Sequence, residues 1–197
     1  MKAITLKHFW AKALGLTLII SGLFGTQAIA REPETAEFKP QLRFAVMMAN
    51  SHALNATKDG KRVIIIPGWG FDLDYRFHKR WSVAFQTDVK LQSFEVEEEN
   101  VMVKRTFPVS VAGVIHFYPL KHWSFYTGPG CEIEKSKTVF LVKAGTEYSF
   151  EITDRFEIGL NFIYEGKIKL YDSFTFGIAL NSRVWEKGQP KKPKKIE

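Results

Sequence analysis

The stretch that decides the fold of this chain runs Gly68-Trp-Gly-Phe-Asp-Leu-Asp-Tyr-Arg-Phe77. Every second residue, from Trp69 to Phe77, carries a large apolar side chain, and the residues between them are glycine or charged. Successive side chains of a β-strand point to opposite faces, so a period of two is typical of a strand. Residues 68–77 therefore predict a β-strand with one apolar face and one polar face.

Seven further segments repeat this alternation. In each, every second residue is mostly aromatic or aliphatic, and the residues between are mostly small or polar. Aromatic and β-branched residues suit a pleated strand. These segments are residues 42–48, 81–92, 107–117, 123–133, 140–151, 156–165 and 174–181. Residues 41–185 are therefore predicted to form an all-β, eight-stranded antiparallel up-and-down transmembrane β-barrel.

The direction of the apolar faces separates a membrane barrel from a soluble one. The interior of an eight-stranded barrel is only just wide enough for side chains to fill it or to hold one small ligand. The apolar set contains most of the 17 Phe and 5 Trp, which would overfill that space. We therefore predict that apolar side chains face lipid and polar side chains face the lumen. A soluble periplasmic lipocalin-like ligand binder, with the faces reversed, is the alternative.

Short and long links alternate along the chain. Aromatic residues bracket the short links, residues 78–80, 119–122 and 153–155. Outer-membrane barrels combine short periplasmic turns with longer extracellular loops and aromatic girdles at both interfaces. The long links, around residues 53–62, 95–104, 134–137 and 165–172, are then extracellular, and both chain termini are periplasmic. The expected periplasmic girdle consists of Phe77, Trp81, Phe117, Trp123, Phe150 and Phe156.

Charged residues of both signs fall on the inward parity. Buried charges require partners, so we predict an ion-pair network that fills the lumen, with a narrow gated pore as the alternative. We expect its acids on neighbouring strands to pair with Arg76 and Lys90. The expected members are Asp72, Asp74, Arg76, Asp88, Lys90, Glu132, Lys143 and Glu147.

Both ends of the chain differ from its body. Residues 1–30 combine early lysines, a short apolar stretch and the small-x-small pattern Ala28-Ile-Ala30, which predicts a cleaved signal peptide; an uncleaved anchor is the alternative. Residues 31–40 are expected to form a periplasmic segment, and the Lys/Pro-rich residues 186–197 a disordered periplasmic tail. The ends carry most of the net charge of +7. The nearly neutral body argues against a nucleic-acid partner, because phosphate binding needs a basic face on the domain.

Four motifs lie on the predicted strands: Tyr126-Thr-Gly-Pro-Gly130, Phe140-Leu-Val-Lys-Ala-Gly145, Tyr148-Ser-Phe-Glu151 and Phe174-Thr-Phe-Gly-Ile178. In pattern, size and plan the chain resembles the small outer-membrane β-barrel proteins of Gram-negative bacteria, such as outer-membrane protein X and the transmembrane domain of outer-membrane protein A. The resemblance covers roughly residues 40–185. It implies a monomer in contact with outer-membrane lipid and the barrel-assembly machinery. Such barrels usually end on an aromatic residue, whereas here Trp185 precedes the tail and is out of phase with Phe174 and Phe176.

Strong catalytic or metal-binding patterns are missing from the sequence. A single cysteine, Cys131, excludes an intrachain disulfide and a multi-cysteine metal site, and we expect no cofactor. Ser110 and His116 share the inward parity with Glu132 and Glu147, but six residues along a strand span roughly 20 Å, too far for a Ser–His hydrogen bond. We expect His116 to be a hydrogen-bonded lumen residue and the chain not to be an enzyme.

Several functions remain open at this point. The favoured one is a non-enzymatic outer-membrane protein that contributes to envelope integrity or to surface interaction through its extracellular loops. A narrow pore for small solutes and a lipid-modifying enzyme are the alternatives within the membrane. The basic tail is either a solvated end or a segment that binds an anionic envelope polymer or lipid headgroups.

The membrane assignment makes a prediction about fractionation. The mature chain, residues 31–197, is expected in the membrane fraction and in need of detergent for extraction. A closed barrel unfolds slowly, so its gel mobility is expected to change on boiling. A chain that stays soluble without detergent and shows one mobility before and after heating would contradict the membrane barrel.

Overall fold

The computed structural model divides the chain into two units, residues 1–37 and 38–197. The structure describes residues 38–188 of the second unit, except 55, 59–60, 63–64, 99–100, 135–136 and 169–170. The expected signal peptide, most of the N-terminal segment and most of the basic tail lie outside the described residues. Among the described residues, no helix has the length and apolar content needed to cross a membrane.

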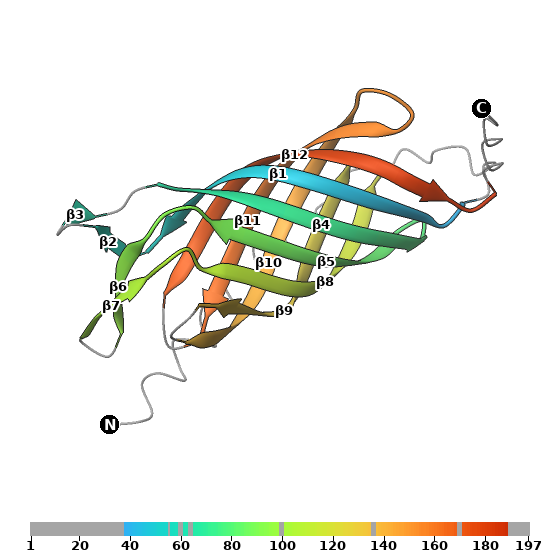
Figure 1. Ribbon diagram of the computed structural model, residues 1–197. Helices are drawn as coiled ribbons and strands as arrows, with labels where there is room; N and C mark the ends of the chain where they lie inside the picture. The colour runs from blue at the N-terminus through green and yellow to red at the C-terminus, as the bar shows by residue number, and fades with distance from the viewer. Residues whose placement is uncertain are drawn as a thin grey trace, which may run out of the picture. The chain divides into compact units, whose positions relative to one another are not determined.

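Eight strands close into one antiparallel barrel, in the order β1-β12-β11-β10-β9-β8-β5-β4 (Figure 1). Barrel strands that follow one another along the chain are neighbours, and the first pairs with the last. The predicted eight-stranded up-and-down fold is confirmed. The strands are β1 (Gln41–Ala53), β4 (Ile66–His78), β5 (Trp81–Lys90), β8 (Val109–Leu120), β9 (Trp123–Ile133), β10 (Thr138–Glu151), β11 (Phe156–Lys167) and β12 (Asp172–Glu186).

Apolar side chains cover the outside of the barrel. On β4, Phe71 and Leu73 are 43% and 46% exposed, whereas Asp74 between Leu73 and Tyr75 is only 5% exposed. On β11, Leu160 and Phe162 are exposed and Asn161 is buried. An apolar exterior is the arrangement of a barrel in lipid. The lipocalin-like alternative needs the opposite arrangement and does not fit.

The two ends of the barrel differ in their links. The turn end has the short links 79–80, 121–122 and 152–155, together with the start of β1 and the end of β12. The loop end has the links 54–65, 91–108, 134–137 and 168–171.

Two loop-end links contain strands of their own. β2 (Ala56–Lys58), β3 (Lys61–Arg62), β6 (Phe94–Glu98) and β7 (Val101–Arg105) form a second antiparallel sheet in the order β3-β2-β6-β7, drawn beyond the ends of the barrel strands in Figure 1. The sequence analysis assigned these residues to polar loops. The signal that it missed is the pair Phe94 and Val96, both almost fully buried, which alternate with acids inside a charged run.

The link from β7 to β8 reverses the face that the chain presents. Arg105 and Pro108 are both buried, although a continuous strand would point them to opposite faces. Between them, Phe107 has a φ of 47°. This left-handed conformation is costly for a large side chain, and the following proline restricts Phe107 further. The strained turn lets Arg105 point into the barrel mouth while β8 keeps its own inward register.

A β-bulge changes the position of Trp185. The register between β1 and β12 shifts between Leu42 and Arg43, because Leu42 faces Trp185 and Arg43 faces Arg183. The extra residue, Val184, brings Trp185 onto the outer surface, where it is 46% exposed. One inserted residue therefore turns Trp185 to the same outer face as Phe174 and Phe176, although the alternation in the sequence puts it on the opposite face.

Glycines on β8 and β9 provide a matched test of barrel packing. A Cβ on Gly128 would lie 2.0 Å from the backbone oxygen of Gly113, whereas a Cβ on Gly113 would meet nothing within 4 Å. Gly128→Ala is expected to lower the free energy of unfolding by about 1–3 kcal/mol, because the two strands must move apart. Gly113→Ala is expected to change it by less than about 0.5 kcal/mol. Urea unfolding in lipid vesicles measures both; equal effects would contradict the close approach.

Candidate functional site

The lumen is the place where the barrel gathers its polar side chains, and it contains two separate polar networks. The network nearer the turn end is centred on Arg43 of β1. Arg43 donates to Asp74 of β4 at 2.7 Å, to the Tyr118 hydroxyl of β8 at 2.8 Å and to Glu157 of β11 at 3.1 Å. Tyr118 in turn donates to Asp74 at 3.0 Å. One guanidinium therefore joins four strands across the lumen.

Glu147 is held next to this network by neutral donors. Its carboxylate accepts hydrogen bonds from Ser149 at 2.8 Å, Asn181 at 3.0 Å and Asn161 at 3.2 Å. Asp72 accepts one from the amide of Gln86 at 3.2 Å. These carboxylates are satisfied by hydrogen bonds from amides and a hydroxyl, which stabilise a buried charge without a cation.

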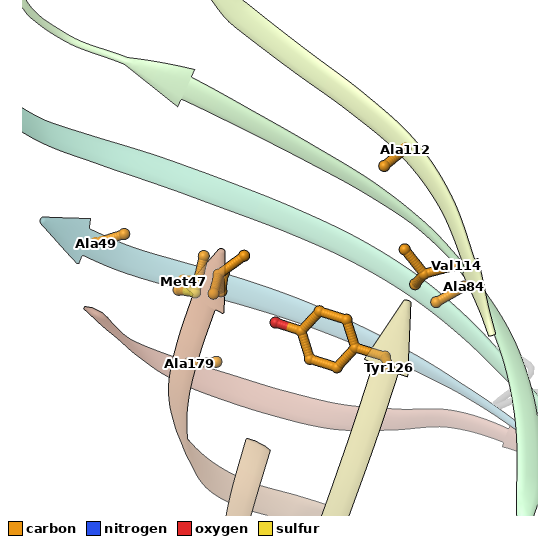
Figure 2. Close-up of a cluster of buried hydrophobic side chains, with 8 residues drawn as sticks. Met47, Ala49, Ala84, Ala112, Val114, Tyr126 and Ala179 are labelled. Carbon is orange, nitrogen blue, oxygen red and sulfur yellow. The ribbon is translucent and has the colours of Figure 1, made fainter. Parts of the chain in front are cut away.

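Buried apolar side chains also line the lumen, in a cluster called the apolar layer. Its members come from six of the eight barrel strands, and Figure 2 shows seven of them with the Tyr126 ring among them. The layer consists of Met47, Ala49, Ala84, Ala112, Val114, Tyr126, Ile163 and Ala179. The alternation in the sequence predicts mostly small or polar residues on the inner face, and Met47, which lies on the same face of β1 as Arg43, departs from it.

The network nearer the loop end is centred on Glu132 of β9, which is fully buried. Lys90 of β5 donates to Glu132 at 3.2 Å and to Glu165 of β11 at 3.1 Å. Lys167 donates to Glu165 at 3.0 Å and lies 3.5 Å from Glu132. Lys143 and Asp88 form an ion pair beside them. Positive and negative side chains thus alternate across the part of the lumen nearer the loop end.

Two residues from the loop-end links also bind Glu132. Arg105 at the end of β7 donates to it at 2.8 Å, and the Tyr171 hydroxyl donates to both of its oxygens at 2.8 and 2.9 Å. Burial raises the pKa of the Tyr171 phenol, which keeps this donor protonated. Glu132 therefore connects the barrel wall to the β6–β7 hairpin and to the link between β11 and β12.

An apolar cluster lies over this contact at the loop end. Tyr171 packs edge-on against Phe94, with ring centroids 5.7 Å apart. The cluster, called the loop-end cap, consists of Ala53, Ala56, Ile66, Phe94, Val96 and Tyr171. The cap and Glu132 together close the loop end of the lumen.

The predicted lumen residues lie on the inner wall, but several have other partners than those expected. Asp74 pairs with Arg43, and Arg76 instead lies 3.9 Å from the centre of the Tyr118 ring and donates to the Lys79 carbonyl. Lys90 pairs with Glu132 and Glu165, not with the acids of β4 and β5. Arg76 and Lys90 therefore do not neutralise the neighbouring aspartates: Asp74 pairs with Arg43 on the adjacent strand β1, Asp72 accepts a hydrogen bond from Gln86 on the adjacent strand β5, and Asp88 pairs with Lys143 of β10.

His116 differs from its expected state as well. Its ring stacks on Tyr126 at 4.6 Å and on Tyr118 at 6.0 Å, and neither ring nitrogen has a hydrogen-bond partner among the described residues. The Ser110 hydroxyl has none either. A nucleophile–base pair needs a hydrogen bond between its members, and the described residues show none between Ser110 and His116.

The predicted girdle residues lie on the outer surface near the turn end. Trp81 and Phe117 are in contact, with ring centroids 5.0 Å apart. Trp123 stacks on Phe125 at 5.4 Å, and Phe150 contacts Tyr148 at 4.9 Å. Phe77 and Phe156 are also exposed. Phe125 and Tyr148 extend the aromatic surface beyond the predicted set.

Comparisons with known proteins give structural matches alone. No protein-family model matches the sequence, and no curated protein matches it. The chain is similar to Ail, the attachment invasion locus protein of Yersinia pestis, solved in complex with the heparin analogue sucrose octasulfate; identity is 16% over 74% of this chain and 99% of Ail, with a TM-score of 0.41. Neisserial surface protein A is 12% identical over 75% of this chain and 100% of its own, with a TM-score of 0.43. The outer-membrane protein OprG from Pseudomonas aeruginosa is 8% identical over 78% of this chain and 100% of its own, with a TM-score of 0.46.

The Glu132 contacts predict a large stability effect. Glu132→Ala leaves Lys90, Arg105 and Lys167 without their shared carboxylate, and breaking a buried ion pair costs about 3–5 kcal/mol. The matched control is Glu151→Ala, which removes the exposed ion pair with Lys121 and is expected to cost less than about 1 kcal/mol. Urea unfolding of both variants in lipid vesicles measures the difference. A Glu132→Ala barrel as stable as the Glu151→Ala barrel would show that Glu132 does not hold the loop end.

Proposed function

We propose that this chain is a non-enzymatic integral outer-membrane β-barrel that anchors the loop-end sheet at the cell surface and contributes to envelope integrity or to surface interaction. The filled lumen carries this proposal. Two cavities lined mostly by lumen residues have volumes of about 10 Å³ each, roughly the space of one water molecule. Because the interior is occupied, the ends of the barrel are left to contact other molecules.

A narrow pore is less well supported by this geometry. Conduction needs a continuous polar path, whereas buried apolar side chains, among them Met47 and Tyr126, also line the lumen. Ions would also have to displace charges that are already paired, such as Lys90 with Glu132. Both features oppose passage through the resting barrel.

A lipid-modifying enzyme has less support still. Ser110 and His116 are buried in the lumen, at 1% and 4% exposure, away from the lipid-facing surface where such a substrate lies. Their polar atoms make no hydrogen bond to each other, so the serine has no base to activate it.

The orientation that fits this function places the turn end in the periplasm. Short turns at one end and longer links at the other are the pattern of outer-membrane barrels. Protease added to intact cells is then expected to cut within residues 54–65 or 91–108 and to spare residues 186–197. Cleavage of the tail alone would reverse the orientation.

The expected partners follow from the same placement. The apolar exterior fits outer-membrane lipid, and the outward position of Trp185 supports its role as the end signal for the barrel-assembly machinery. Because the outward side chains of the barrel strands are mostly apolar, a monomer surrounded by lipid is the simplest state. The basic tail is proposed to bind an anionic envelope polymer; unchanged retention on cell-wall preparations after deletion of residues 186–197 would remove that partner.

Conductance in planar bilayers tests the closed lumen. The folded protein is expected to give no channel events, because paired charges and buried apolar side chains line the lumen. A general porin added afterwards to the same bilayer is the positive control. Reproducible channels from heat-modifiable, folded protein would contradict the proposed function and favour the pore.

A further inference from the structure

Exposed basic side chains surround the turn end of the barrel. Each of the three short turns contributes at least one, and so do the residues that flank the first and last strands. Two exposed acids, Glu151 and Asp154, lie among them. The basic residues, called the basic collar, are Lys39, Lys79, Arg80, Lys121, Arg155 and Lys187.

The excess of basic residues belongs to the turn end and is much weaker in the loop-end links. In sequence, residues 54–65, 91–108, 134–137 and 168–171 hold eight basic and six acidic residues, a mixed population. The collar has six basic residues against two acids. The chain beyond Gly188, which starts from the turn end, adds four more lysines and one acid in sequence. A charge asymmetry of this kind indicates an anionic partner at the turn end.

The collar lies directly beside the aromatic girdle. Lys79 is two residues from both Phe77 and Trp81, and Arg155 is adjacent to Phe156. At roughly 3.3 Å per residue, these charges lie within about 7 Å of the girdle along the strand direction. The headgroup region on each side of a bilayer is about 5–7 Å thick. The collar is therefore at headgroup depth when the girdle is at the edge of the hydrocarbon.

Most of the collar is available to an external anion. Lys121 has a partner, Glu151, at 3.1 Å, and this pair is itself exposed. Among the described residues, no acidic group lies within ion-pair distance of Lys79, Arg80 or Arg155. Long basic side chains at a membrane interface extend their charge toward headgroups while their stems cover apolar surface.

We propose that the basic collar binds the anionic headgroups of phospholipids in the leaflet at the turn end and fixes the depth of the barrel in the bilayer. This inference rests on the proposed membrane function. A lipid headgroup fits better than a cell-wall polymer, because the collar lies at headgroup depth, next to the girdle. Phosphate groups at this depth can contact several turns at once without leaving the bilayer.

Tryptophan fluorescence tests the proposal. Trp81, Trp123 and Trp185 lie on the outer surface near the turn end and report on the lipids beside the collar, whereas Trp69, which is exposed in the loop-end half of β4, is replaced by Phe in every chain compared. The mature protein is folded into phosphatidylcholine vesicles that contain brominated phosphatidylglycerol or, at the same fraction, brominated phosphatidylcholine. Quenching is expected to show a several-fold enrichment of phosphatidylglycerol, and this enrichment is expected to fall with salt.

Matched variants assign the effect to the collar. The triple variant Lys79→Gln, Arg80→Gln, Arg155→Gln is expected to lose most of the enrichment. The control triple variant Lys104→Gln, Lys137→Gln, Lys169→Gln changes the same number of charges in the loop-end links and is expected to keep it. A chain that ends at Gly188 is also expected to keep it.

Three results would overturn the inference. In the first, the collar variant keeps the phosphatidylglycerol enrichment. In the second, only the chain that ends at Gly188 loses the enrichment, which assigns the effect to the tail. In the third, the collar variant loses retention on cell-wall preparations while its lipid enrichment is unchanged, which assigns the collar to a polymer. Gel mobility before and after heating, measured on the same vesicle samples, distinguishes failure of the proposed function from failure of this inference alone. Protein that does not fold into vesicles contradicts the proposed function, whereas folded protein without enrichment contradicts this inference alone.

Discussion

The pairing of β1 with β12 is the constraint on which the rest of the structure depends. Lipid offers no water to backbone N–H and C=O groups, so a strand in a membrane must be paired on both sides. The ladder from Gln41 to Ala53 against Ser173 to Glu186 supplies the last of these pairings. Closure with eight strands also sets the width of the lumen, which leaves room for side chains and little else.

A narrow, closed lumen in turn decides how its charges are arranged. Every inward side chain loses access to bulk water, so acids and bases must find each other or neutral donors. Arg43 and Glu132 each meet this requirement by joining several strands. The apolar layer of the lumen needs no such partners. The same side chains that stabilise the barrel also fill its lumen, which is the premise of the proposed function.

In the proposed function, the barrel therefore contacts other molecules at its two ends. At the loop end, Arg105 and Tyr171 bring the links down onto Glu132 under an apolar cap, which gives the second sheet a firm base. The strained backbone of Phe107 is part of this arrangement, because it allows Arg105 to point inward. At the turn end the girdle and the basic collar lie side by side. We propose that the loop end displays the second sheet and that the turn end contacts lipid headgroups.

The sequence by itself determined the number of barrel strands, the face that each presents and the position of the girdle, because a period of two is a local property that Trp69 to Phe77 already shows. The same alternation also puts Arg43 and Glu165 on the inward face of the predicted segments 42–48 and 156–165, although neither was among the expected members of the ion-pair network. Only the tertiary structure decided which charges pair. Arg43 with Asp74 and Arg105 with Glu132 come from different strands, and their meeting depends on register and closure. The tertiary structure also decided that Trp185 faces outward and Arg105 inward. A single bulge or a single left-handed residue shifts the alternation of inward and outward side chains, and that alternation is what assigns faces from the sequence.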